Sequence, residues 1–127
     1  MYYSFYQPTD RTLPMIATAD IGAEIARLLT EGWEGKKIVE LGSPVSPDDQ
    51  ARAMGEVLGR PVKAQAIPRE QWAAILQGFG MPPGTTAPYE EMLDGSNSGW
   101  IDFGVPGTEP VDGTTTAAQV FASARKA

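Results

Sequence analysis

The chain has 127 residues, of which 42% are hydrophobic and 20% are charged, a composition typical of one globular domain with a buried core. Its net charge of −6 argues against binding to nucleic acid or to an anionic membrane surface, because both depend on lysine and arginine. Cysteine and histidine are absent, which excludes disulfides, thiolate nucleophiles, Cys/His zinc sites and a histidine general base.

The start of the sequence and its apolar runs bear on location. The N-terminus has neither a basic stretch nor an apolar stretch, so we expect no signal peptide. No apolar run approaches the roughly 18 residues of a transmembrane helix, so we expect no membrane span. Together with the absence of cysteine, these patterns favour a cytoplasmic protein.

Residues 1–19 are predicted to form an aromatic strand and a hairpin. The run "YYSFY" has strand propensity. Pro8 to Arg11 has the composition of a turn. The following "PMIAT" is then expected to pair back as a second short strand.

Residues 20–79 are predicted to alternate helices with strands. Asp20 is expected to be the N-cap of a first helix with one apolar face, formed by Ile21, Ile25, Leu28 and Leu29. "KKIVELG" is a predicted strand, and Ser46 with Asp49 predicts a capping box at the start of a second helix. "PVKAQAIP" predicts another strand and "PREQWAAILQGFG" a third helix.

Residues 80–127 are predicted to be rich in loops. Residues 80–88 and 105–113 contain the prolines and glycines of loops, with a short helix over 89–95 between them and a threonine-capped helix at the end. No repeat or long linker divides the chain. We therefore predict a single α+β domain over 1–127, with a small sheet of about three or four short strands and about four or five helices.

The order and spacing of several segments resemble the C-terminal half of NmrA-like proteins, a group of atypical short-chain dehydrogenases/reductases. The resemblance covers about residues 3–122. It is carried by "YSFYQPTDRTLPMIATADIG", "GKKIVELGSPVSPDDQA", "LGRPVKAQAIPREQW", "EMLDGSNSGWIDF" and the "GTTT" before the last helix. The resemblance implies the substrate-side half of such a protein.

The cofactor half of that family has no counterpart in this sequence. Family members begin with a Rossmann domain, whose glycine-rich turn brings backbone N–H groups and a helix N-terminus to a dinucleotide pyrophosphate. Neither G-x-G-x-x-G nor G-x-x-G-x-x-G occurs here, and the Tyr-x-x-x-Lys pair of the dehydrogenases is absent. We therefore expect no cofactor bound to this chain and assign no catalytic residue.

Large side chains of the C-terminal half are the candidate ligand pocket, because the resemblance implies that this region closes over the substrate. An apolar pocket with a few polar groups is the functional interpretation, and a plain hydrophobic core is the structural one. Met81 and Tyr89 flank a loop and favour the pocket, whereas Trp72 favours the core. The full candidate set is Trp72, Phe79, Met81, Tyr89, Met92 and Trp100.

We expect the acidic residues to have mainly structural roles. Glu90, Glu91, Asp94 and Asp102 lack the spacing of a calcium loop, and Asp94-Gly95 is ordinary turn chemistry, so we expect no metal site. Asp48 and Asp49 lie in the first turn of a predicted helix, where negative charge is favourable.

The aromatic start of the chain is the candidate surface for self-association. Tyr2, Tyr3, Phe5 and Tyr6 would be covered by the Rossmann half in a full-length relative, according to the resemblance. Without that half, an aromatic strand at a sheet edge favours pairing with a second copy. The alternative is a hairpin that covers itself.

Three functional hypotheses follow. The first is a non-catalytic binding or interaction protein that forms a homodimer and takes a protein partner. The second is a substrate-side subunit or fragment of an NAD(P)-dependent reductase that needs a separate Rossmann chain. The third is a carrier of a small apolar ligand that uses the aromatic cluster.

Overall fold

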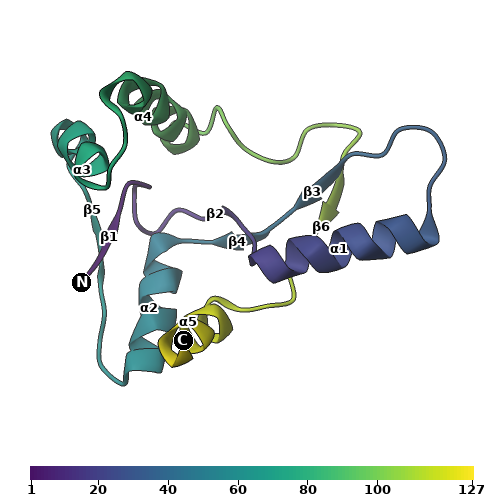
Figure 1. Cartoon of the computed structure of the whole chain (residues 1–127), viewed down its shortest axis with the longest axis horizontal. Helices are drawn as coiled ribbons and strands as arrows, with labels where there is room; N and C mark the ends of the chain where they lie inside the picture. The colour runs from purple at the N-terminus through teal and green to yellow at the C-terminus, as the bar shows by residue number, and fades with distance from the viewer.

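A computed structural model describes residues 1–127 as a mixed α+β structure, which confirms the predicted fold class (Figure 1). The strands are β1 (Tyr2–Ser4), β2 (Leu13–Met15), β3 (Val39–Leu41), β4 (Ser43–Val45), β5 (Ala64–Ala66) and β6 (Glu109–Val111). The helices are α1 (Thr18–Glu31), α2 (Pro47–Leu58), the 3-10 turn η1 (Arg69–Gln71), α3 (Trp72–Gly78), α4 (Pro83–Asn97) and α5 (Ala117–Lys126).

The six strands form three separate two-stranded sheets. β1 pairs in parallel with β5, β2 pairs antiparallel with β4, and β3 pairs in parallel with β6. The expected hairpin between the first two strands is therefore wrong, since each of them has a different partner. A local turn predicts a change of direction, but the partner of a short strand is chosen by distant residues.

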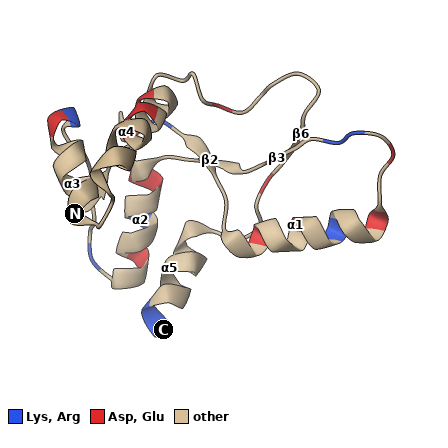
Figure 2. Ribbon diagram, turned by 45° about the horizontal axis from the view of Figure 1, so that its top comes forward, with Lys and Arg blue, Asp and Glu red and all other residues tan.

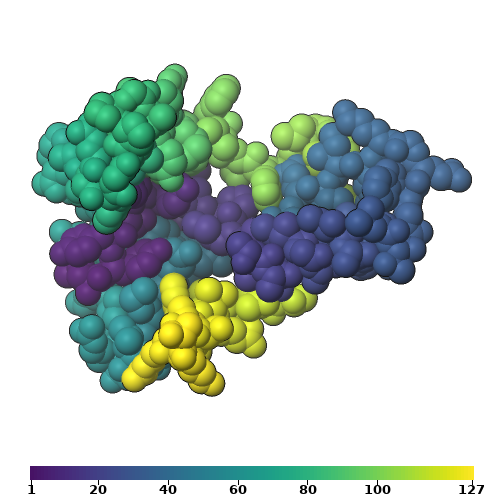
Figure 3. Space-filling view, viewed as in Figure 1, coloured from purple at the N-terminus to yellow at the C-terminus, as the bar shows by residue number.

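The elements divide into two regions. The packed lobe consists of β1, β5, η1 and helices α2 to α5, and the arm consists of α1, residues 32–38 and the β3–β6 pair. In Figures 1 and 3 the arm extends away from the lobe, with β2 and β4 running between them. Figure 2 shows acidic and basic residues scattered over both regions instead of gathered on one face.

The core of the packed lobe is built around Trp72, which is only 1% exposed. Its indole N–H donates to the Ile67 carbonyl at 2.8 Å, and the ring of Phe5 meets it edge-on with centroids 5.8 Å apart. Leu93 of α4 completes this cluster, and the Arg69 guanidinium lies 4.7 Å from the Trp72 ring. The core thus joins the N-terminus to α3 and α4.

Helix α4 begins at Pro83, so the loop predicted for residues 80–88 is wrong from residue 83 onward. Pro83 lies in the first turn, where the missing N–H costs no hydrogen bond. The hydroxyls of Thr85 and Thr86 both donate to the Pro82 carbonyl, at 2.8 and 3.2 Å. The prolines and threonines that suggest a loop therefore start a helix. Strand β6, in the other predicted loop, is also missed by the sequence patterns.

Two capping predictions are confirmed and one is wrong. The Ser46–Asp49 capping box is present, and Thr116 forms another with Gln119 at the start of α5. The N-cap of α1 is Ala17, not Asp20. The Asp20 carboxylate instead accepts hydrogen bonds from the N–H groups of Thr114 and Thr115, at 2.9 and 2.8 Å.

None of the helices has both the length and the apolar composition needed to cross a bilayer.

Candidate functional site

A small, mostly apolar pocket of about 210 Å³ lies where the two regions meet. It is enclosed by the turn after β1, by β2, by the end of α4 and by the loop that follows α4. The lining residues are Tyr6, Leu13, Pro14, Met15, Ser96, Ile101, Asp102 and Phe103. We call this the ring pocket.

The backbone on both sides of Tyr6 is held by one side chain of α4. Asn97 accepts the Gln7 N–H at 3.0 Å and donates its amide to the Phe5 carbonyl at 2.9 Å. The Tyr6 N–H donates to the hydroxyl of buried Ser4 at 3.0 Å. These bonds fix the backbone of Tyr6, whose side chain packs against the core cluster and also lines the pocket.

Arg11 completes this wall by capping the C-terminal end of α4. Its guanidinium donates to the carbonyls of Ser96 and Asn97, at 2.8 and 2.6 Å. The last carbonyls of a helix have no partner within the helix, and a cation there is also favoured by the helix dipole. The segment before β2 and the end of α4 are thereby joined.

Two glycines allow the loop beside the pocket to pack closely on the backbone. A Cβ atom at Gly95 would lie 2.9 Å from Cδ1 of Ile101, so a larger residue there would displace the end of this side chain from α4. A Cβ atom at Gly42 would lie 3.2 Å from the Phe103 ring and 3.1 Å from Cβ of Pro14. Ile101 and Phe103 therefore cover the pocket through close contact with backbone.

Glu40 anchors the far end of the same loop. This residue is 9% exposed, and its carboxylate accepts the N–H groups of Gly104 and Val105 at 2.7 and 3.2 Å as well as the Thr108 hydroxyl. The hydrogen bond from Thr108, followed by those from the two backbone N–H groups, lowers the pKa of Glu40 against the opposing effect of desolvation. The carboxylate is thus charged and fully used in holding the loop.

Tyr6 and Asp102 are the two titratable residues that line the pocket. Burial raises the pKa of the Tyr6 phenol, so it is a neutral O–H group at physiological pH. Asp102 is exposed, and one of its carboxylate oxygens accepts the Phe103 N–H at 2.8 Å. The other oxygen is free to accept a hydrogen bond.

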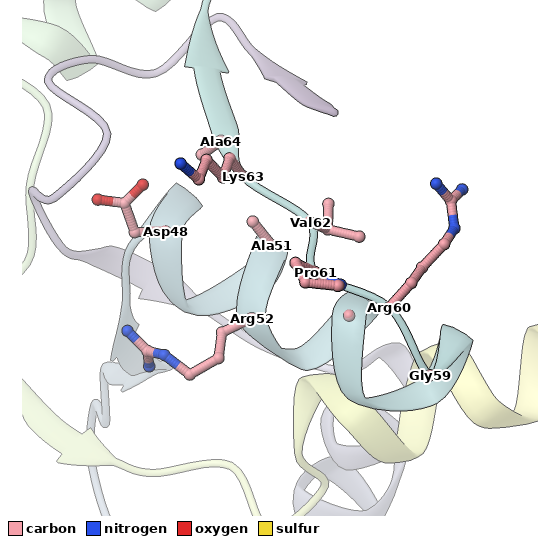
Figure 4. Close-up of a pocket in the computed structure, with 10 residues that line it drawn as sticks. Asp48, Ala51, Arg52, Gly59, Arg60, Pro61, Val62, Lys63 and Ala64 are labelled. Carbon is pink, nitrogen blue, oxygen red and sulfur yellow. The ribbon is translucent and has the colours of Figure 1, made fainter.

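A larger groove of about 650 Å³ lies between α2 and residues 59–64 and is open to solvent. Figure 4 shows Arg52 and Arg60 pointing in different directions from its two sides. Arg52 is also engaged by Asp49 at 2.8 Å. Because its charged groups do not converge and only three of its ten lining residues are hydrophobic, the groove has no recognisable ligand chemistry.

The structure disperses the six residues of the candidate aromatic pocket. Trp72 is in the core, Met81 is half-buried, and Tyr89 and Met92 are 39% and 41% exposed on α4. Phe79 and Trp100 are 80% and 85% exposed. None of the six lines the ring pocket or the larger groove.

The aromatic N-terminus is mostly used within the chain. The Tyr2 hydroxyl donates to Gln50 at 2.5 Å, Phe5 packs on Trp72, and Tyr6 lines the ring pocket. Only Tyr3, at 64% exposed, presents its ring to solvent.

Sequence reasoning missed the residues that build the pocket, above all Asn97, Arg11 and Glu40. One signal for Glu40 was available, because it is a carboxylate inside an otherwise apolar predicted strand. The contacts of Asn97 and Arg11 span 85 to 92 positions and leave no local pattern.

Comparison with known proteins places this geometry on a known fold. No family model and no curated protein matches the sequence. An NADPH-dependent quinone oxidoreductase from Escherichia coli is similar in structure, with a TM-score of 0.69 and 23% identity over 98% of this chain. The triphenylmethane reductase of Citrobacter sp. is similar with a TM-score of 0.70 and 19% identity over 99% of this chain. The structure of the Citrobacter sp. enzyme in complex with NADP(H) is similar with a TM-score of 0.60 and 18% identity over 84% of this chain.

This chain has the fold of part of these reductases. The resemblance to NmrA-like proteins is confirmed at the level of the fold. The chain spans less than half of each solved structure, namely 46%, 45% and 38% of their lengths. More than half of each reductase therefore has no counterpart in this chain.

Proposed function

We propose that this chain is the substrate-side portion of an NADPH-dependent reductase whose dinucleotide-binding portion is supplied by other residues, on the same polypeptide or on a second chain. Support comes from a fold match that covers almost all of this chain and less than half of the similar reductases. The absence of a glycine-rich phosphate-binding turn from the sequence agrees with this division.

The observation that carries the proposal is the uncovered apolar face of the arm. Helix α1 has no buried residue, and Ile25 and Leu29 are 52% and 70% exposed. Trp33 and Ile38, in the segment that follows, are 52% and 45% exposed. An amphipathic helix normally packs its apolar face, and a large exposed apolar patch marks an interaction site.

The polar face of α1 needs no partner. Arg27 pairs with Glu24 at 2.6 Å and also with Glu31, and Asp20 is bound by Thr114 and Thr115, so the charges of this helix are satisfied within the chain. What remains for a partner is the apolar face, and the occupant that fits is the portion by which the similar reductases exceed this chain.

The test is to isolate this protein from its source by a C-terminal tag and to measure NADPH binding and NADPH-dependent quinone reduction. We expect an NADPH-binding portion to accompany the chain, whereas the 127 residues alone bind no NADPH. The double variant Ile25→Gln/Leu29→Gln should reduce both activities at least about tenfold, because glutamine amides buried in an apolar contact are costly.

The matched control is Phe79→Gln, which removes an even more exposed apolar side chain from the packed lobe. It should leave both activities unchanged. A chain that is isolated alone, without NADPH binding and indifferent to the α1 substitutions, would overturn the proposal.

A second candidate is a non-catalytic protein that self-associates through β1. The second edge of β1 has no strand partner, and Tyr3 beside it is 64% exposed. An unpaired edge is a site for pairing with another copy. Light scattering coupled to size exclusion would then show a dimer at twice 13.6 kDa that Tyr3→Lys converts to a monomer and that NADPH leaves unchanged.

A further inference from the structure

We propose that the ring pocket binds a single six-membered aromatic ring that carries a hydroxyl group, with this hydroxyl donating to Asp102. This inference deepens the proposed function, because it names the class of ligand that the substrate-side portion binds. Any reaction of the bound ring rests on the proposed function. The binding itself needs only residues of this chain, so it can be tested separately.

The size of the pocket selects one ring. A cavity of about 150 Å³ lined by apolar side chains is enough to bind benzene. The ring pocket, at about 210 Å³, therefore admits one ring with small substituents. Drug-sized ligands occupy pockets of roughly 300 Å³ or more, so a molecule of several fused or linked rings would extend out of this pocket into solvent.

The walls suit a flat apolar body. Five of the eight lining residues are hydrophobic, and they cover the pocket from two sides: Leu13, Pro14 and Met15 belong to β2, and Ile101 and Phe103 to the loop. An aromatic ring gains both area burial and favourable contact with the Phe103 ring and with the methionine sulfur.

The polar groups select a neutral hydrogen-bond donor. Asp102 offers an oxygen that can only accept, so it favours a ligand O–H and repels a ligand carboxylate.

The site is organised before a ligand arrives. Asn97 and Ser4 hold the backbone around Tyr6, while Glu40 and the close packing at the two glycines hold the loop that carries Ile101 to Phe103. Little conformational freedom is left to lose on binding, which favours affinity for a ligand as small as one ring.

The experiment is a titration of the isolated chain with phenol and with toluene, which differ by hydroxyl against methyl, followed by NMR of the methyl groups of Leu13, Met15 and Ile101. For a ligand of this size we expect dissociation constants of about 1 mM. Asp102→Asn should raise the dissociation constant of phenol about fivefold and change that of toluene less than about twofold. Benzoate should not bind.

The control is Glu91→Gln, which removes the same charge from an exposed position of α4 outside the pocket and should change neither ligand. Asp102 is exposed, so its variant is expected to fold, and an unchanged methyl spectrum without ligand verifies this. The inference is overturned by an absence of shifts at about 10 mM phenol. It is equally overturned if Asp102→Asn affects phenol and toluene alike. Both results concern the isolated chain and leave the proposed dinucleotide-binding portion open to its own test.

Discussion

The packed lobe and the arm are stabilised by different interactions. The lobe buries Trp72, Leu93 and Ile67 in one cluster, and its helices pack on each other. The arm buries no residue of α1 and is held by polar contacts, such as Asp20 to Thr115 and, within the arm, Lys37 to Glu109 at 3.1 Å. Polar contacts at a surface add little stability, which is why we propose the arm as the surface that a partner covers.

The ring pocket lies between these two regions and draws on both. Tyr6 comes from the packed side, through the turn after β1, and Phe103 comes from the loop that Glu40 of the arm anchors. A partner that covers the arm would therefore also steady one wall of the pocket. This is how association at α1 and binding in the pocket are connected in the proposal.

The largest contrast should come from two tryptophans. Trp72→Ala removes a core side chain with its hydrogen bond to Ile67 and should lower the free energy of unfolding by about 3–5 kcal/mol. Trp100→Ala, at a residue that is 85% exposed, should change it by no more than about 0.5 kcal/mol. Urea denaturation of both variants checks this, and similar losses would show that the described core is not the core.

Loss of the Asn97 side chain, which holds the turn after β1, should have an intermediate effect on stability. Asn97→Ala removes two hydrogen bonds to the backbone of Phe5 and Gln7 and should cost about 1–2 kcal/mol in urea denaturation. It should also weaken phenol binding, because Tyr6 is released. Glu91→Ala on the same helix is the control. An equal loss of unfolding free energy there would mean that helix propensity is responsible and not the two hydrogen bonds of Asn97.

The hydrogen bonds by which Glu40 holds the loop should weaken at acidic pH. Because the pKa of Glu40 is lowered from its ordinary 4.5, its contribution to stability is present above that pH and is lost as the pH falls through the lowered value. The protection of the Gly104 amide against hydrogen exchange, measured relative to the intrinsic exchange rate at the same pH, should therefore fall at acidic pH. In Glu40→Gln the protection of this amide should be low at pH 7 already and should no longer change with pH, and high protection in that variant would contradict the anchoring role of Glu40.

The smallest effect is expected on the uncovered helix. In the isolated chain, Ile25→Gln/Leu29→Gln should change the free energy of unfolding by no more than about 0.5 kcal/mol, because neither side chain is buried. The same change at Ile75, which packs against the core, should cost several times more. A large loss in the α1 variant would show that this face is already packed within the chain.

Local chemistry by itself determined much of the secondary structure. The Ser46–Asp49 capping box, the threonine cap of α5 and the amphipathic pattern of α1 are set by residues within one or two turns, so they are readable in order along the chain. The start of α4 was misread because proline and glycine are ambiguous between a loop and a first helical turn.

Only the tertiary structure decided which strands pair, which aromatic residues are buried and where a pocket lies. β1 pairs with β5 across some sixty positions, and Asn97 reaches Phe5 across 92. Such contacts depend on how the whole chain closes, and no window of the sequence contains both partners. For the same reason Tyr6, an apparent interface residue by composition, is placed in a pocket, whereas Trp100 is left in solvent.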